Sequence, residues 1–203
     1  FKNSNKEFAV SLFSEVDDYI NSGYQNKRIG NKFSTKYEIY EDIYFRPSAG
    51  VQYDKLQITG NASSLLRNRQ GSFATTSLGY NFFIDQRDSK FNTTSGSIFY
   101  FDQNFATLLS DIPAIQTGTG VTLYQELLND KFIGSAKIKL ANVTALENKD
   151  AKLSDRLFAS QSDLRGFELR GVGPVDSGDH IGGNNLATLS LKSTFPNPIP
   201  ENL

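Results

Sequence analysis

The chain has 203 residues, with 21 Lys and Arg against 22 Asp and Glu, one His and no Cys. This balance provides no basic surface for nucleic acid, and the lack of Cys excludes disulfides, a thiolate nucleophile and Cys metal sites. No window approaches ~18 consecutive apolar residues, so we expect no transmembrane helix. The chain starts at Phe1 with neither Met nor a signal peptide, which indicates a processed or excised piece.

Apolar and polar residues alternate with a period of two along most of the chain, which predicts an all-β protein. In one segment Ala74, Leu78 and Phe82 share one face, while Thr75 and Asn81 share the other. The aromatic content of 12% comes from Phe and Tyr alone, which suits strands that are apolar on one face. Eight strands are predicted, at roughly 7–16, 33–41, 43–56, 73–86, 96–105, 119–128, 132–145 and 184–195.

Long and short connections alternate between these strands. Long loops are expected at 17–32, 57–72, 105–118 and 146–183, and shorter links at 41–42, 88–95 and 129–131. Outer-membrane barrels have this rhythm, with short turns on one side and longer loops on the other. It favours an antiparallel transmembrane β-barrel over a soluble β-sandwich, whose Greek-key links are less regular. A Pro-rich stretch at 196–200 cannot continue a central strand.

The length of the last loop limits how such a barrel can close. Eight strands could close a small barrel, but its interior would be filled by side chains and could not house a loop of about forty residues. A sheet in lipid also cannot leave an open edge. The chain lacks the aromatic residue that usually ends a complete barrel. We therefore expect residues 1–203 to form part of one larger barrel domain, with an internal or extracellular loop at 146–183.

Three motifs follow one another along the chain. The first is a turn motif with Asp85, Asp88 and Gly96. The second is a tip in the longest loop, where a guanidinium can bind carboxylates in a bidentate manner and a glycine allows a tight turn. The third is a Gly-Gly-Asn segment at 182–184 that leads into the last alternating strand. The second motif comprises Arg165, Gly166 and Phe167, followed by Gly171, Gly173 and Pro174.

In this order, the motifs resemble the BamA-type insertase family, whose barrels carry periplasmic POTRA domains. The resemblance covers nearly the whole chain, as strands five to twelve of about sixteen. It implies a non-enzymatic protein of the bacterial outer membrane that assembles and inserts β-barrel proteins. Arg165 would hold the loop tip against the inner wall. Partners would be unfolded outer-membrane proteins, periplasmic lipoprotein subunits and lipid; no cofactor, metal or nucleic acid is expected.

Two positions depart from the family pattern. Lys192 stands where the family commonly has an acidic residue, and alternation points it into the lumen, where it would repel Arg165. Asp163 or Glu168, or a residue outside this chain, would then have to be the acidic partner. Residues 160–161, Ser and Gln, replace the family's Gly-Gly pair.

Other functions remain open at this stage. A polypeptide translocator of the same superfamily, of the two-partner secretion or TamA type, shares the loop motif, and a small passive pore shares the strand pattern. Asp85 and Asp88 could form a paired-carboxylate or Ca²⁺ site, but we interpret them as residues that cap a turn. Asp176, Ser177 and His180 have the residue types of a triad without a nucleophile elbow, and we interpret His180 as a solvated loop residue.

Overall fold

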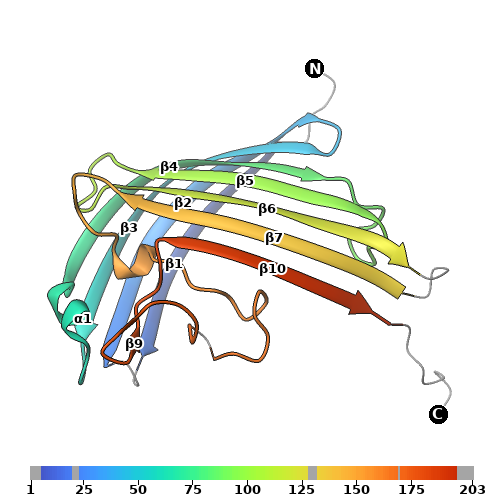
Figure 1. Cartoon of the computed structure of the whole chain (residues 1–203). Coiled ribbons are helices and arrows are strands. Elements are labelled where there is room, and N and C mark those ends of the chain that lie inside the picture. The colour runs from blue at the N-terminus through green and yellow to red at the C-terminus, as the bar shows by residue number, and fades with distance from the viewer. Residues whose placement is uncertain (1–5, 20–22, 128–131, 169, 196–203) are drawn as a thin grey trace, which may run out of the picture.

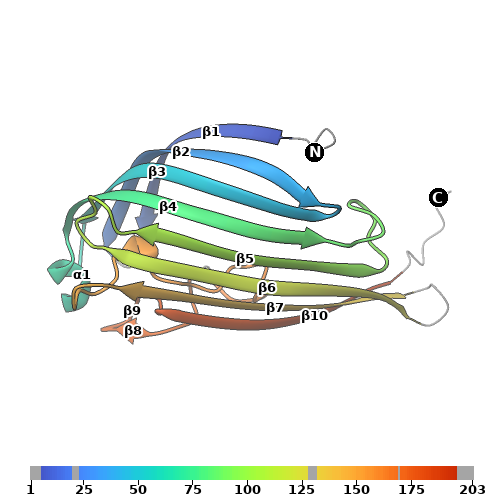
Figure 2. The same cartoon turned by 90° about the horizontal axis from the view of Figure 1, so that it is seen from above.

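The computed structural model describes residues 6–19, 23–127, 132–168 and 170–195. Eight antiparallel strands form a single sheet in which every strand pairs with the next one along the chain (Figures 1 and 2). The sheet is arched and open, with the first and last strands at its two edges. Its strands are β1 (Lys6–Tyr19), β2 (Tyr24–Tyr40), β3 (Ile43–Ile58), β4 (Gly71–Asp85), β5 (Gly96–Ala106), β6 (Ala114–Leu127), β7 (Phe132–Ala145) and β10 (Asn185–Thr194).

Four short elements lie near one end of the sheet (Figure 2). They are α1 (Ser64–Asn68), the 3₁₀ turn η2 (Leu153–Asp155), and the strands β8 (Val175–Asp176) and β9 (Asp179–His180), which pair with each other. All but α1 belong to residues 146–183, which we call the internal loop. This loop passes beneath the concave side of the sheet (Figure 1). Among the described residues, no helix is long and apolar enough to cross a membrane.

The sequence-based strand predictions are confirmed in number and order, and a single arched sheet is incompatible with the two packed layers of a β-sandwich. Two loop predictions were wrong. Most of residues 17–32 is strand, because β1 reaches Tyr19 and β2 begins at Tyr24, and β6 already begins at Ala114. The strand ends in these two segments carry polar or small residues on both faces, so apolar and polar residues do not alternate clearly there. The predicted 129–131 turn and 196–200 breaker lie outside the described residues.

The register gives the sheet one apolar and one polar face, since paired residues on neighbouring strands share a face. The apolar face is exposed and lies on the convex side; it includes Val10, Ile29, Phe33, Val51, Leu78, Phe99, Leu123, Ile138, Leu140, Leu189 and Leu191. The concave face includes Lys32, Gln52, Ser77, Asp102, Lys137, Lys139 and Lys192. Such a division is typical of a transmembrane barrel wall.

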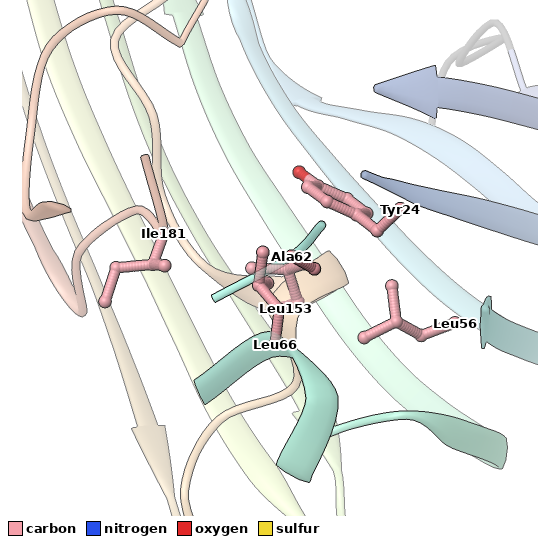
Figure 3. Packing of buried hydrophobic residues seen from close by; sticks show 6 residues of the cluster. All are labelled: Tyr24, Leu56, Ala62, Leu66, Leu153 and Ile181. Atoms are coloured by element: carbon pink, nitrogen blue, oxygen red, sulfur yellow. The ribbon is translucent and has the colours of Figure 1, made fainter. Parts of the chain in front are cut away.

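The buried apolar cluster lies under the internal loop at the α1 end of the sheet (Figure 3). It combines side chains from the wall, from α1 and its preceding turn, and from the internal loop. Its members are Tyr24, Leu56, Ala62, Leu66, Leu153 and Ile181. Because the cluster needs all three contributors, burial of its apolar surface holds the base of the loop against the wall.

The two faces of β4 should respond differently to a charge. Leu78 is 50% exposed on the apolar face at the middle of the strand, and we expect Leu78→Arg to reduce the free energy of unfolding in lipid by about 2–4 kcal/mol. Ser77→Arg places the same charge on the adjacent residue, which lies on the polar face, and should reduce the free energy of unfolding far less. Chemical denaturation of the whole protein in lipid vesicles measures both, and equal losses would contradict this assignment of faces.

Candidate functional site

A buried ion pair attaches the start of the internal loop to the wall. The Lys152 ammonium lies 3.0 Å from the Asp54 carboxylate of β3 and donates a 2.7 Å hydrogen bond to the Thr75 hydroxyl of β4. The side chains of Lys152 and Asp54 are each only 2% exposed. Asp155 lies 3.5 Å from the same ammonium, and burial raises the pKa of its carboxyl. An unpaired charge at this depth would be costly, so each partner depends on the other.

Two loop carboxylates bind the beginning of α1. Asp179 accepts a 2.7 Å hydrogen bond from the Ser63 amide, and Asp176 accepts a 3.0 Å hydrogen bond from the Leu65 amide. Helix N-termini have free amides that carboxylates satisfy well. The β8–β9 hairpin turns through Ser177 and Gly178, both at positive φ (50° and 94°). The geometry thus gives Asp176 a structural contact, and it places the half-buried His180 in β9.

Arg170 attaches the loop to the β1 and β2 edge of the sheet. Its guanidinium lies over the rings of Tyr19 and Phe158, with its central carbon 4.2 and 4.3 Å from their centroids. It also donates a 2.9 Å hydrogen bond to the Tyr24 hydroxyl. The Tyr19 and Tyr24 rings stack with centroids 4.7 Å apart. Cation–π contacts and a hydrogen bond therefore link the loop to β1 and β2, a role that the sequence analysis missed.

Asp163 attaches the loop to the β7 and β10 side of the wall. Its carboxylate accepts hydrogen bonds from Lys137 at 2.7 Å, Lys139 at 3.3 Å and Ser160 at 2.7 Å. Its backbone carbonyl accepts a 3.1 Å hydrogen bond from the Ser190 hydroxyl of β10. Burial opposes ionisation, but the hydrogen bonds from Lys137 and Ser160 and the two lysine charges keep the pKa of Asp163 well below its ordinary value.

The predicted tip residues lie just beyond Asp163 and are more open. Arg165, Gly166 and Phe167 are exposed, with Phe167 at 57%, and Gly166 has a positive φ of 86°. Arg165 lines a cavity of about 640 Å³ together with Lys137, Asp163 and Lys192. Among the described residues, Arg165 has no carboxylate within 4.0 Å. Docking of Arg165 against the wall therefore stays a prediction.

The glycines and proline after the tip shape the return of the loop. The Gly171 amide donates a 2.9 Å hydrogen bond to the Glu168 carbonyl. Gly173 has a φ of 132°, a conformation that side-chain-bearing residues avoid. The Pro174 carbonyl then accepts a 3.0 Å hydrogen bond from the Ile181 amide. The β8–β9 hairpin that follows contacts the beginning of α1 through Asp176 and Asp179.

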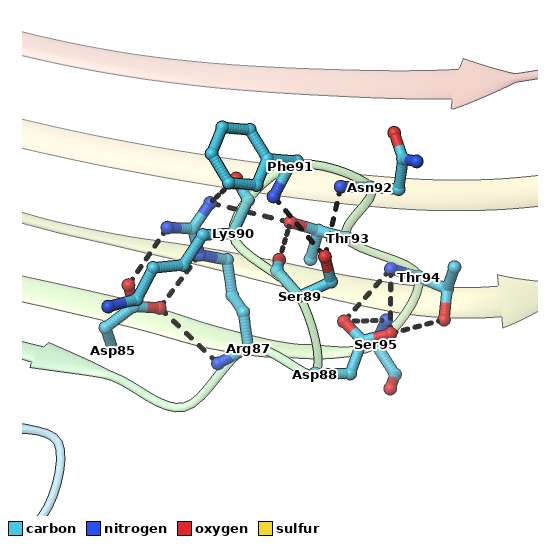
Figure 4. Close-up of polar contacts among 10 residues, drawn as sticks. All are labelled: Asp85, Arg87, Asp88, Ser89, Lys90, Phe91, Asn92, Thr93, Thr94 and Ser95. Carbon is cyan, nitrogen blue, oxygen red and sulfur yellow. Dashed lines mark hydrogen bonds and ion pairs between the residues drawn. The ribbon is translucent and has the colours of Figure 1, made fainter.

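The turn between β4 and β5 lies at the end of the sheet away from α1 (Figure 2), and Figure 4 shows its polar contacts. Asp85 forms a bidentate ion pair with Arg87, at 2.8 and 2.9 Å. Asp88 accepts hydrogen bonds from the Thr94 hydroxyl at 2.7 Å and from the Thr94 and Ser95 amides. At Gly96, whose φ is 106°, any side chain would collide with the carbonyl oxygen of Gln86. Among the described residues, no three His, Asp or Glu side chains are grouped to hold a metal ion.

The buried and exposed ion pairs of the internal loop should differ in energetic weight. Lys152→Ala leaves the Asp54 carboxylate buried without its cation, and we expect it to destabilise the loop base by about 3–5 kcal/mol. Lys149→Ala removes the Lys149–Glu147 pair, whose side chains are 43% and 63% exposed, and should cost about 1 kcal/mol or less. Thermal unfolding of the two variants compares them, and similar losses would contradict the buried-pair account.

The β4–β5 turn should resist acid. Hydrogen bonds from the Thr94 hydroxyl and from backbone amides lower the pKa of Asp88 to about 2, against about 3.9 in an unfolded chain. Because the folded pKa is depressed, the stabilisation is complete above the unfolded value and disappears as the pH falls through about 2. Amide NMR shifts of Thr94 and Ser95 should titrate there, and Asp88→Asn should abolish the titration; a midpoint near 4 would contradict it.

Comparison with known proteins identifies relatives of this chain. The human protein "Sorting and assembly machinery component 50 homolog" is 22% identical over 183 residues, which cover 89% of this chain and 39% of the relative. "Sorting assembly machinery 50 kDa subunit" of Saccharomyces cerevisiae is 29% identical over 141 residues, 66% of this chain and 28% of the relative.

A solved structure shares the fold. The structure "BamA from Haemophilus ducreyi lacking POTRA domains 1-3" superposes with a TM-score of 0.86 at 20% identity, over 97% of this chain and 43% of that one. The chain thus spans less than half the length of these matched proteins. The family described as "Omp85 superfamily domain" matches residues 1–202. The chain therefore belongs to the Omp85 superfamily.

Proposed function

We propose that this chain is part of the barrel of an outer-membrane machine that folds and inserts other β-barrel proteins. The observation that carries the proposal is the internal loop, which is fixed to the concave wall of an open Omp85-type sheet at both sides of that sheet. Two similar proteins have assembly in their names and are 22% and 29% identical to this chain over the matched residues. The activity belongs to the whole protein, of which this chain supplies the central wall and loop.

The proposed mechanism involves no bond chemistry. An apolar convex face anchors the wall in lipid, and the internal loop braces its concave face. Client strands pair with an exposed strand edge elsewhere in the barrel, because an edge offers free backbone amides and carbonyls. The described residues contribute a stiff, curved wall, which keeps that edge from collapsing onto other parts of the barrel.

The proposed partners follow from this mechanism. They are unfolded β-barrel precursors, membrane lipid and accessory subunits, for which the sequence resemblance suggested periplasmic lipoproteins. The expected location is an outer membrane. A bacterial outer membrane stays a prediction, because the relatives come from human and yeast and the structural neighbour comes from a bacterium.

A reconstitution experiment tests the proposal. The full-length protein in liposomes is mixed with a urea-unfolded β-barrel client, and client folding is followed by its gel mobility without boiling. We expect faster folding than in liposomes that lack the protein or contain an unrelated barrel. Steady ionic conductance without faster folding would instead indicate a passive pore. Passage of an added polypeptide into the liposome interior, again without client folding, would indicate a translocator.

A further inference from the structure

We propose that Asp163, and not Arg165, holds the loop tip on the inner wall, so that Asp163 is a positioning residue for this site. The contact has the opposite charge arrangement from the one expected for Arg165, with the acid on the loop and the bases on the wall. The proposed consequence for client insertion rests on the proposed function, whereas the contact itself does not.

The carboxylate of Asp163 has the geometry of a strong anchor. Its side chain is only 1% exposed, and it accepts from two lysines, Lys137 and Lys139. Charge-assisted hydrogen bonds are stronger than neutral ones, and their strength increases where water is excluded. The backbone around it is also fixed, since the amides of Asp163 and Leu164 both donate to the Ser160 carbonyl at 2.9 Å.

Two neighbouring strands of the wall, β7 and β10, provide the side chains that bind Asp163. Lys137 and Lys139 are two positions apart on β7, so both extend from its concave face while Ile138 between them lies on the exposed apolar face. Lys137 is paired in register with Ser190 of β10, whose hydroxyl binds the Asp163 carbonyl. Two neighbouring strands thus bind the side chain and the backbone of one loop residue.

The same wall disfavours Arg165 as the anchor. Arg165 shares its cavity with the cations Lys137 and Lys192 and with the single carboxylate of Asp163, which Lys137 and Lys139 already bind. Like charges repel across such short distances, most strongly where solvent is scarce. A lysine-rich wall therefore attracts a carboxylate and leaves the guanidinium two residues later without this support.

Hydrogen exchange of the full-length protein in lipid nanodiscs tests the contact directly. We expect Asp163→Asn to speed amide exchange in residues 160–166 by about tenfold or more, since the charged hydrogen bonds are lost. Asp163→Glu keeps the carboxylate and should retain protection, and Arg165→Ala should leave exchange unchanged. Glu147→Gln is the matched control, because it removes a loop carboxylate from an exposed pair.

The outcomes separate the anchor from the proposed function. Faster exchange in Arg165→Ala with none in Asp163→Asn would overturn the anchor, as would an equal increase in Glu147→Gln. The same variants are then assayed for client insertion, where we expect Asp163→Asn to be slow and Asp163→Glu to recover. Faster exchange with normal insertion would leave the contact standing and refute its role in insertion. If even the unmodified protein inserts no client, the proposed function fails, while exchange still decides the anchor.

Discussion

Backbone hydrogen bonding in an apolar medium is the constraint on which the rest of this structure depends. Lipid offers no partner to an amide or a carbonyl, so every strand within it must pair along its length. Within the described residues, neighbouring strands pair in nearly continuous antiparallel register, with one irregularity between β2 and β3, and only the outer edges of β1 and β10 are left open. Once the backbone is paired in this way, side chains can only alternate between lipid and the interior, and the polar concave face follows.

A polar interior in turn makes a braced loop possible. The concave wall offers charged and hydroxyl groups that a loop can satisfy, and the internal loop uses them at opposite sides of the sheet. Lys152 and Arg170 bind the β1–β4 side, whereas Asp163 binds β7 and β10. Each contact alone would be a modest gain, because desolvation offsets much of the attraction. Their separation across the sheet converts them into a brace, since changing the curvature would strain several contacts at once.

The strands and their faces could be predicted from the sequence, whereas the contacts between residues far apart in the chain could not. Strand number, order and the apolar face of β4 follow from alternation between adjacent residues, and the structure confirms them. The Lys152–Asp54 pair joins residues 98 apart, and the Arg170–Tyr24 contact joins residues 146 apart. Composition and periodicity carry no signal for such pairs. The sequence analysis named Asp163 as an acidic partner for Arg165, but the lysines that it binds became apparent only from the register of β7.

The internal loop also differs in burial along its length. Its base contributes Leu153 and Ile181 to the buried apolar cluster and contains the almost fully buried Lys152. Its tip has a largely exposed Phe167 and a glycine at positive φ with open space around it. Local opening costs least where few apolar contacts are lost. Opening therefore costs least at residues 165–167, whereas Asp163, at the boundary with the buried base, keeps this exposed tip attached to β7 and β10.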